Sequence, residues 1–171
     1  MNQFLVNVVR AGLGDAVGLM KELKPEEITH DILMEDEVIF RMIDAKTRET
    51  GYLCKVINIM DFHGFSFSRI DRRFFASLGA ASHTASIVYP QFLAKVVVVN
   101  VGTGFKILFS FAKHFMSKST LEKQTICPGN TLKGSAESCP FLKKCGGVSA
   151  IPPFLGGTFP MPDRLKIEGM D

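Results

Sequence analysis

Thr120 and Lys123 lie three residues apart, so on a helical turn their side chains share one face. A hydroxyl donor beside an ammonium group can hold a phosphate monoanion or diester. The simpler interpretation is structural: Ser119-x-x-Glu122 has the spacing of a capping box, and Thr120 would then only begin a short helix. The spacing alone therefore leaves phosphate binding and helix capping open.

Motifs for catalysis and nucleotide binding are incomplete in this sequence. Gly102-Thr103-Gly104 follows a strand-like run, but the third glycine of a dinucleotide fingerprint and the Lys-Ser/Thr of a P-loop are missing. Asp61 and His63 are close in sequence without a nucleophile of the G-x-S-x-G kind, and Asp61 at a strand end is more typical of a turn cap than of a base. We therefore expect a protein that is not an enzyme and uses no cofactor.

The cysteines predict neither a metal site nor disulfide bonds. Because Met1 leads directly into polar residues and not into a signal peptide, we expect reduced thiols in a cytoplasmic protein. A zinc site is conceivable, but its spacings match no standard site, and we expect no metal. Its ligands would be Cys127, Cys139 and Cys145 with His114, and the fourth cysteine is Cys54.

The composition restricts the class of protein. Of 171 residues, 46% are hydrophobic and 22% are charged, and Phe occurs 15 times without any Trp, which excludes a disordered chain or a coiled coil. The longest aliphatic run, Val96 to Val99, is far too short to span a membrane. The net charge of +3 is spread in pairs such as Arg72-Arg73, so we expect no nucleic-acid partner, although weak attraction to an anionic membrane fits.

Strand-like and helix-like segments alternate along the chain and predict an α/β fold. Strands are expected at residues 4–9, 52–61, 95–101 and about 124–127. Helices are expected from Pro25 to about Lys46, with an apolar stripe of isoleucines, and from Ile70 to Val88. The four valines of the third strand leave no polar face, so both of its faces should be covered, as in a central parallel strand.

The helix expected from Phe105 to Met116 is apolar on nearly two faces. Phe105, Leu108, Phe109, Ala112 and Phe115 form one stripe, and Ile107 with Phe111 forms a second. Such a helix either lies deep in a core or meets something other than water.

The order of these features resembles the CRAL-TRIO lipid-binding domain, above all that of the fungal phosphatidylinositol/phosphatidylcholine transfer proteins. The resemblance rests on residues 59–64 (IMDFHG), Tyr89-Pro90, residues 95–100 (KVVVVN), the Phe-rich helix, and residues 151–157 (IPPFLGG). It extends from about Phe4 to Gly157, which predicts one lobe over residues 1–157 and a tail over residues 158–171. Each motif is modest alone, and their order and spacing together are specific.

This resemblance implies a mixed, mainly parallel sheet with helices packed on it and a lipid cavity closed by a gate helix. Residues 105–116 correspond to the gate. The resemblance also implies a lipid headgroup site at Thr120, Lys123 and Gln91. The implied cavity and gate residues are Phe105, Leu108, Phe109, Phe111 and Phe115, together with Asn58.

The chain departs from the transfer proteins at several positions. Their inositol-site Glu after Tyr-Pro is Gln91 here, and the following Arg, used for the phosphatidylcholine phosphate, is Phe92. Their Ser and Thr positions before the IMD motif are Val56 and Asn58, and a Ser of the next helix is Ala85. The residues that correspond to the inositol-headgroup contacts are partly kept, and those that correspond to the phosphatidylcholine contacts are largely lost. The N-terminal helical lobe of these relatives precedes the point where this sequence starts, so we expect either a fragment or a domain that does without it.

The leading hypothesis is a non-enzymatic carrier or sensor of one phospholipid, with phosphatidylinositol as the first candidate. It would be a cytoplasmic protein that associates peripherally and transiently with a membrane surface. The first alternative is a module that recruits a membrane or a protein partner without lipid. The second is a carrier of another hydrophobic ligand, such as a sterol or isoprenoid.

Overall fold

The structure is a computed structural model that describes residues 4–102, 104–127, 149, 151–155 and 157–160. Four strands form one sheet: β1 (Phe4–Val9), β2 (Lys55–Asp61), β3 (Leu93–Val99) and β4 (Gln124–Ile126). They pair in the order β1-β2-β3-β4, and all three pairings are parallel. The α/β fold with a mainly parallel sheet is therefore confirmed.

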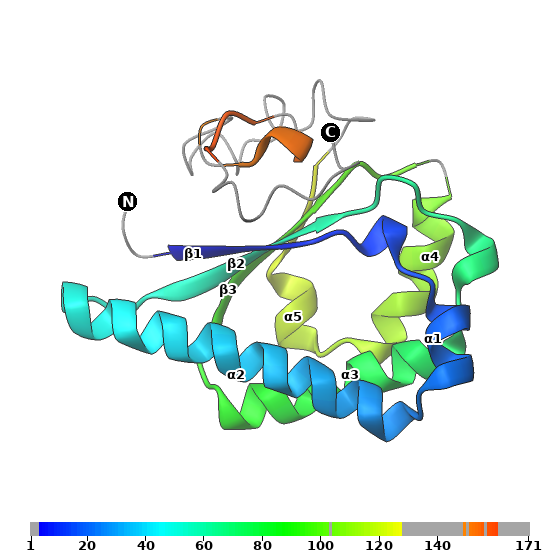
Figure 1. The fold of residues 1–171 in the computed structure, drawn as a ribbon, viewed down its shortest axis with the longest axis horizontal. Coiled ribbons are helices and arrows are strands. Elements are labelled where there is room, and N and C mark those ends of the chain that lie inside the picture. Colours follow the sequence, from blue (N-terminus) through cyan, green and yellow to red (C-terminus); the bar gives the residue numbers. More distant parts are fainter. Residues whose placement is uncertain (1–3, 103, 128–148, 150, 156, 161–171) are drawn as a thin grey trace.

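The helices are α1 (Ala16–Glu22), α2 (Pro25–Thr50), α3 (Arg72–Val88), α4 (Phe105–Ala112) and α5 (Lys118–Glu122). Short 3₁₀ turns lie at η1 (Ala11–Leu13), η2 (Phe67–Arg69), η3 (Lys113–Phe115) and η5 (Pro153–Leu155). Helices α2 to α5 lie on one face of the sheet and η5 lies on the other (Figure 1). Right-handed crossovers between successive neighbouring strands place the connecting helices on the same face.

Strand β3 is buried on both faces, as its four valines predict. Val96 and Val98 pack on the helical side, in a cluster with Phe105 and Leu108 of α4. Val97 and Val99 pack on the opposite side, in a cluster that includes Ile151. A continuous apolar run therefore marks the strand that separates the two layers.

Helix α2 is four residues longer than the sequence predicts. It begins at Pro25, where the backbone N–H of Lys24 donates to Glu27 Oε2 at 2.8 Å, and it ends at Gly51, which adopts φ 72°. Glycine takes this left-handed conformation at little cost, which makes it a common helix terminator. Ile39 and Ile43 of α2 pack against β2, and Thr47 Oγ1 in the last turn accepts from Cys54 N at 3.0 Å, which holds the end of the helix beside the start of β2.

Two further differences from the expected elements have local causes. Helix α1 is not predicted by periodicity because it is only seven residues long, and it is capped by Asp15 Oδ1, which accepts from Gly18 N at 3.0 Å. The helix expected to reach Met116 ends as an α-helix at Ala112 and continues as the 3₁₀ turn η3.

The expectation that all cysteines are reduced is wrong for Cys127, which is disulfide-bonded and fully buried. Its partner lies outside the described residues, as do Cys139 and Cys145 of the conceivable zinc site and nearly all of the expected tail. Cys54 is a buried cysteine that is not part of a disulfide bond. The sequence could not reveal the bond, because the spacing of cysteines along a chain does not fix their pairing.

Candidate functional site

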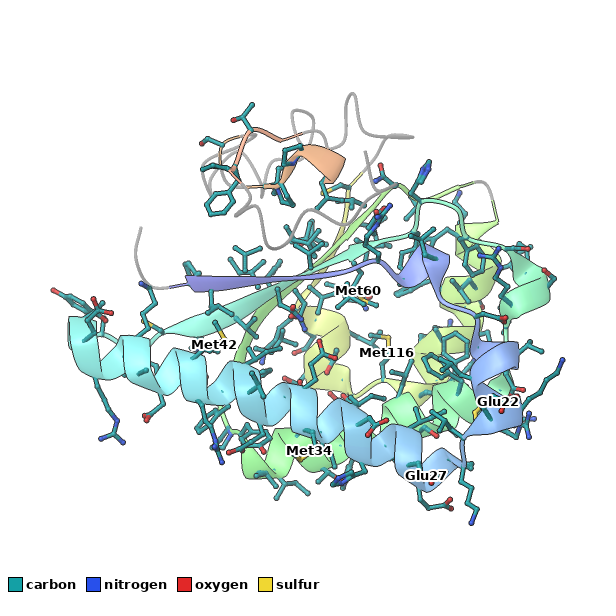
Figure 2. The ribbon with its side chains drawn as sticks, viewed as in Figure 1. Glu22, Glu27, Met34, Met42, Met60 and Met116 are labelled. Carbon is teal, nitrogen blue, oxygen red and sulfur yellow. The ribbon has the colours of Figure 1, made fainter. Side chains whose placement is uncertain are left out.

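A cavity of about 590 Å³ lies between the sheet and the helices. Strands β2 and β3 contribute its floor through Met60, Val96 and Val98, and α2, α3, α4, η3 and α5 contribute the other walls. Met60 projects from the sheet, and Met116 lies beyond α4 beside α5, in the space that these elements enclose (Figure 2). The volume is within the usual range of small-molecule sites.

Aromatic rings from three parts of the chain line the cavity. Phe62 follows β2, Phe75 belongs to α3, and Phe105 and Phe109 belong to α4. The Phe62 and Phe105 rings meet edge to face with centroids 5.0 Å apart, and the Phe75 and Phe115 centroids are 6.3 Å apart. These contacts join the end of β2, α3 and the α4–η3 segment into one apolar wall, which can accept an alkyl chain or a ring system.

Thr120 lies on the cavity wall within the first turn of α5. The cap of this helix is Ser117, whose Oγ accepts from Thr120 N at 3.1 Å and lies 2.8 Å from Thr120 Oγ1. The capping box expected at Ser119 is therefore wrong, since the helix starts two residues earlier. Thr120 serves the first turn and faces the cavity at once, so the two interpretations left open by its spacing do not exclude each other.

Lys123 also lines the cavity, at the C-terminal end of α5. Its backbone is fixed on both sides, because Lys123 N donates to Thr120 O at 3.2 Å and Lys123 O accepts from Val96 N at 3.1 Å. Its ammonium group makes no ion pair with any acid in the described part of the chain. A half-buried cation on the same wall as a hydroxyl group, in a mainly apolar cavity, is suited to an anionic ligand group.

Gln91 lines the cavity from the turn between α3 and β3. Its φ of 64° is unusual for a residue with a side chain. Gln91 Oε1 accepts from Lys55 Nζ at 2.8 Å, so this turn carries a second cation near the cavity. The amide N–H groups of Gln91 then supply the hydrogen bonds that it could offer to a ligand.

Asp36 of α2 is a cavity residue that the sequence reading missed. Burial, followed by the charge of the neighbouring Glu35, raises the pKa of its carboxyl group from 3.8 to about 6. A sequence signal existed, because Asp36 lies four residues after Ile32 and interrupts the isoleucine stripe that faces the core. An acidic residue in such a stripe either has its charge removed or paired within the core, or it faces a cavity. Only the tertiary structure distinguishes these two cases.

The structure brings eight of the nine expected site residues to this one cavity. They are Thr120, Lys123, Gln91, Asn58, Phe105, Leu108, Phe109 and Phe115. The exception is Phe111, which packs against Phe75 and Phe115 with ring centroids 5.4 and 5.2 Å apart. The two residues of the second stripe of α4 therefore have different environments. Phe111 packs against other rings, whereas Ile107 is 69% exposed. The roles of all nine toward a ligand remain predictions.

Asp61 has the structural role that the sequence favours. Its Oδ1 accepts from His63 N at 2.9 Å and from Asn100 Nδ2 at 2.8 Å, and its Oδ2 lies 3.8 Å from Arg10 Nε. These contacts fix the turn that follows β2. Within the residues described here, no cluster of three His, Cys, Asp or Glu could hold a metal ion, and none of the helices is both long and apolar enough to span a bilayer.

A mainly apolar cavity between a parallel sheet and its covering helices, with polar groups on part of its wall, is typical of a protein that binds a lipophilic small molecule. The family model of the CRAL/TRIO domain matches residues 16–147, and the chain belongs to this family. CRAL-TRIO domains bind lipophilic ligands and are in general not enzymes.

Two relatives illustrate the similarity. The CRAL-TRIO domain-containing protein F28H7.8 of Caenorhabditis elegans is 27% identical over 133 residues, which are 74% of this chain and 31% of that protein. The crystal structure of Sfh5 matches with a TM-score of 0.47 and 20% identity, over 71% of this chain and 41% of that one. The chain thus spans about a third of the length of the curated relative.

Proposed function

We propose that this domain binds one phospholipid, with phosphatidylinositol as the first candidate, and carries or senses it without enzymatic chemistry. The observation that supports this proposal is the position of Lys123 and Thr120 on the wall of an otherwise mainly apolar cavity. Acyl chains would leave water for the Phe-lined part, at about 0.8 kcal/mol for each buried CH₂ group. The ammonium and hydroxyl groups would hold the phosphate.

The departures from the transfer proteins favour an inositol lipid over a choline lipid. Phe92 lines the cavity where those relatives have the Arg that binds the phosphatidylcholine phosphate, so no guanidinium is available at this position. Gln91 keeps hydrogen-bonding capacity at the position of their inositol-site Glu. Lys55, bonded to Gln91, adds positive charge near the same turn.

Exchange of the lipid is proposed to occur at a membrane surface, with the domain peripherally bound in the cytoplasm. The supporting feature is α4, which has Phe105 and Leu108 buried toward the cavity and Ile107 exposed on its outer side. A helix of this kind can exchange contact with the cavity for contact with lipid. The disulfide bond of Cys127 is more typical of an oxidising compartment, so the cytoplasmic location needs its own test by microscopy of the tagged chain.

The test is extraction of the purified chain with organic solvent and lipid mass spectrometry, followed by transfer assays between vesicles. We expect a stoichiometric phospholipid. Lys123→Ala should lower phosphatidylinositol transfer more than phosphatidylcholine transfer. The matched control is Lys118→Ala, because Lys118 is exposed on the same helix and does not line the cavity.

Other outcomes would redirect the proposal. Equal loss of both lipids in Lys123→Ala would contradict the headgroup assignment. A stoichiometric sterol or isoprenoid would identify another hydrophobic cargo, and a chain that binds vesicles or a partner without extractable lipid would be a recruitment module.

A further inference from the structure

Asn58, Val96 and Gln124 form a row across three strands of the sheet. In the parallel register Asn58 of β2 is paired with Val96 of β3, and Val96 is paired with Gln124 of β4. Paired residues point to the same face, and all three line the cavity. With strands about 4.8 Å apart, the two amide-bearing residues flank Val96 at a Cα separation of about 10 Å.

Among the residues that the structure describes, none donates a hydrogen bond to the amide oxygens of this row. Asn58 Oδ1 and Gln124 Oε1 are both buried and accept no hydrogen bond from the described residues. The nitrogen of Gln124 makes only a long contact, 3.5 Å to Met116 Sδ. Buried acceptors without a donor are rare in folded proteins, and a pair of them on residues that line a cavity is open to a donor from a ligand or water.

We propose that Asn58 and Gln124 form a subsite for hydroxyl groups on the cavity floor, which selects lipids whose polar group carries O–H donors. This inference rests on the proposed function and names the part of the ligand that the row would contact. Each oxygen is covered in the structure, so a ligand hydroxyl would reach it after rotation about the terminal amide torsion, which is soft.

The position of the row relative to Lys123 fits a polyol attached to a phosphate. Gln124 directly follows Lys123, and Val96 N donates to Lys123 O, so the row begins beside the proposed phosphate contact. A phosphate held by Lys123 and Thr120 places the hydroxyl groups of an inositol next to Gln124. Phosphatidylcholine has no O–H or N–H donor, so it would leave both amide oxygens unpaired.

The test uses Asn58→Leu, Gln124→Met and the double variant, which replace each amide by an apolar side chain of similar shape. The control is Thr125→Val, because Thr125 is paired with Val97, whose side chain packs on the opposite face of the sheet. Binding of phosphatidylinositol and phosphatidylcholine from vesicles and urea unfolding are measured for each. We expect the double variant to lose the preference for phosphatidylinositol by about tenfold, with equal or greater stability, since unpaired buried acceptors are removed. Thr125→Val should keep the preference.

The outcomes separate this subsite from the proposed function. If the wild type prefers phosphatidylinositol and the double variant keeps that preference, the subsite is wrong while the function stands. If the wild type takes up neither phospholipid, the function fails, and the subsite is tested with diacylglycerol, which has one hydroxyl, against triacylglycerol, which has none. If the wild type and the double variant then prefer diacylglycerol to the same extent, the subsite is overturned. If the double variant loses a preference that the wild type has, the subsite is supported. Should the double variant not fold, the single variants give the same comparison.

Discussion

The hydroxyl group of Tyr89 donates a 2.6 Å hydrogen bond to Glu37 Oε2, which connects the end of α3 to the middle of α2. Arg41 Nε donates to the other oxygen of the same carboxylate at 2.7 Å. The Tyr89 ring packs on Phe40 of α2, with centroids 4.9 Å apart, and lines the cavity. Tyr89 thus links the two helices that form the wall opposite the sheet.

Tyr89→Phe should lower the stability of the fold at pH 7, because it removes the hydrogen bond and keeps the ring. The Tyr89 hydrogen bond, followed by that from Arg41, lowers the pKa of Glu37, so the stabilisation is present above the unfolded-state pKa near 4.5 and is lost as the pH falls through the folded-state pKa. We expect a Tm lower by about 2–4 °C at pH 7 and a smaller difference at pH 3. Tyr52→Phe is the control, since Tyr52 is 64% exposed. A pH-independent difference would contradict this account.

Asp36→Asn should have the opposite pH dependence. Burial, reinforced by Glu35, raises the pKa of Asp36 from 3.8 to about 6, so the folded state is favoured below pH 3.8 and loses stability as the pH rises to about 6. The uncharged amide of Asn at position 36 removes the cost of holding an ionised carboxylate at this site. Because the site is partly solvated, we expect a gain of about 1 kcal/mol at pH 7 and none at pH 3.5. Urea unfolding at both pH values measures the difference, and Asp31→Asn on the exposed side of α2 should change neither.

The layered fold could be predicted from local sequence because each layer has a local signature. The four consecutive valines of β3 require burial on both faces, and Pro25 with two following acids marks the start of α2. The ends of these elements were less predictable, since tertiary contacts set them. Helix α2 continues to Thr50 and stops before the left-handed Gly51, and Thr47 Oγ1 in its last turn accepts from Cys54 N at 3.0 Å, just before β2.

The site was only partly predictable for the same reason. Thr120 and Lys123 stand out by spacing within one turn, and the family resemblance brings in Gln91 and Asn58. Gln124 carries no such signal, because its relation to Asn58 depends on strand order and register, which link residues 66 positions apart. Asp36 could be noticed in its stripe, but its burial beside a cavity comes from the packing of α2 against the other walls.

Gly79→Ala should disturb the cavity wall where α3 meets η3. A Cβ atom at Gly79 would lie 2.9 Å from the carbonyl oxygen of Phe115, so the backbone of η3 must move. Overpacking of this kind costs about 1–3 kcal/mol, against a gain of up to about 1 kcal/mol from helix propensity. We expect a net loss of about 1 kcal/mol and weaker lipid binding.

Urea unfolding and lipid binding measure the two effects of Gly79→Ala. Gly102→Ala is the control, because a Cβ atom there meets no heavy atom of the described residues within 4 Å. Unchanged lipid binding in Gly79→Ala would show that the position of Phe115 does not matter for the ligand.

Ile107→Asp should weaken the contact with membranes without emptying the cavity. Ile107 is 69% exposed, whereas its neighbour Leu108 is 3% exposed and lines the cavity. Position 107 lies in the first turn of α4, where a carboxylate interacts favourably with the helix dipole, so the fold should be kept. If α4 is the surface that meets lipid, exclusion of this side chain from the bilayer should lower vesicle binding about tenfold, which corresponds to about 1.4 kcal/mol.

Val38→Asp is the matched control for Ile107→Asp, because Val38 is 56% exposed on α2 and does not line the cavity. Vesicle co-sedimentation and the amount of lipid extracted from each variant are the two measurements. We expect only Ile107→Asp to lose vesicle binding and both variants to keep their bound lipid. Equal loss in the two variants would mean that overall apolar exposure, and not α4, governs membrane contact. Loss of extractable lipid from Ile107→Asp would place its effect in the cavity, against an outward-facing role of Ile107.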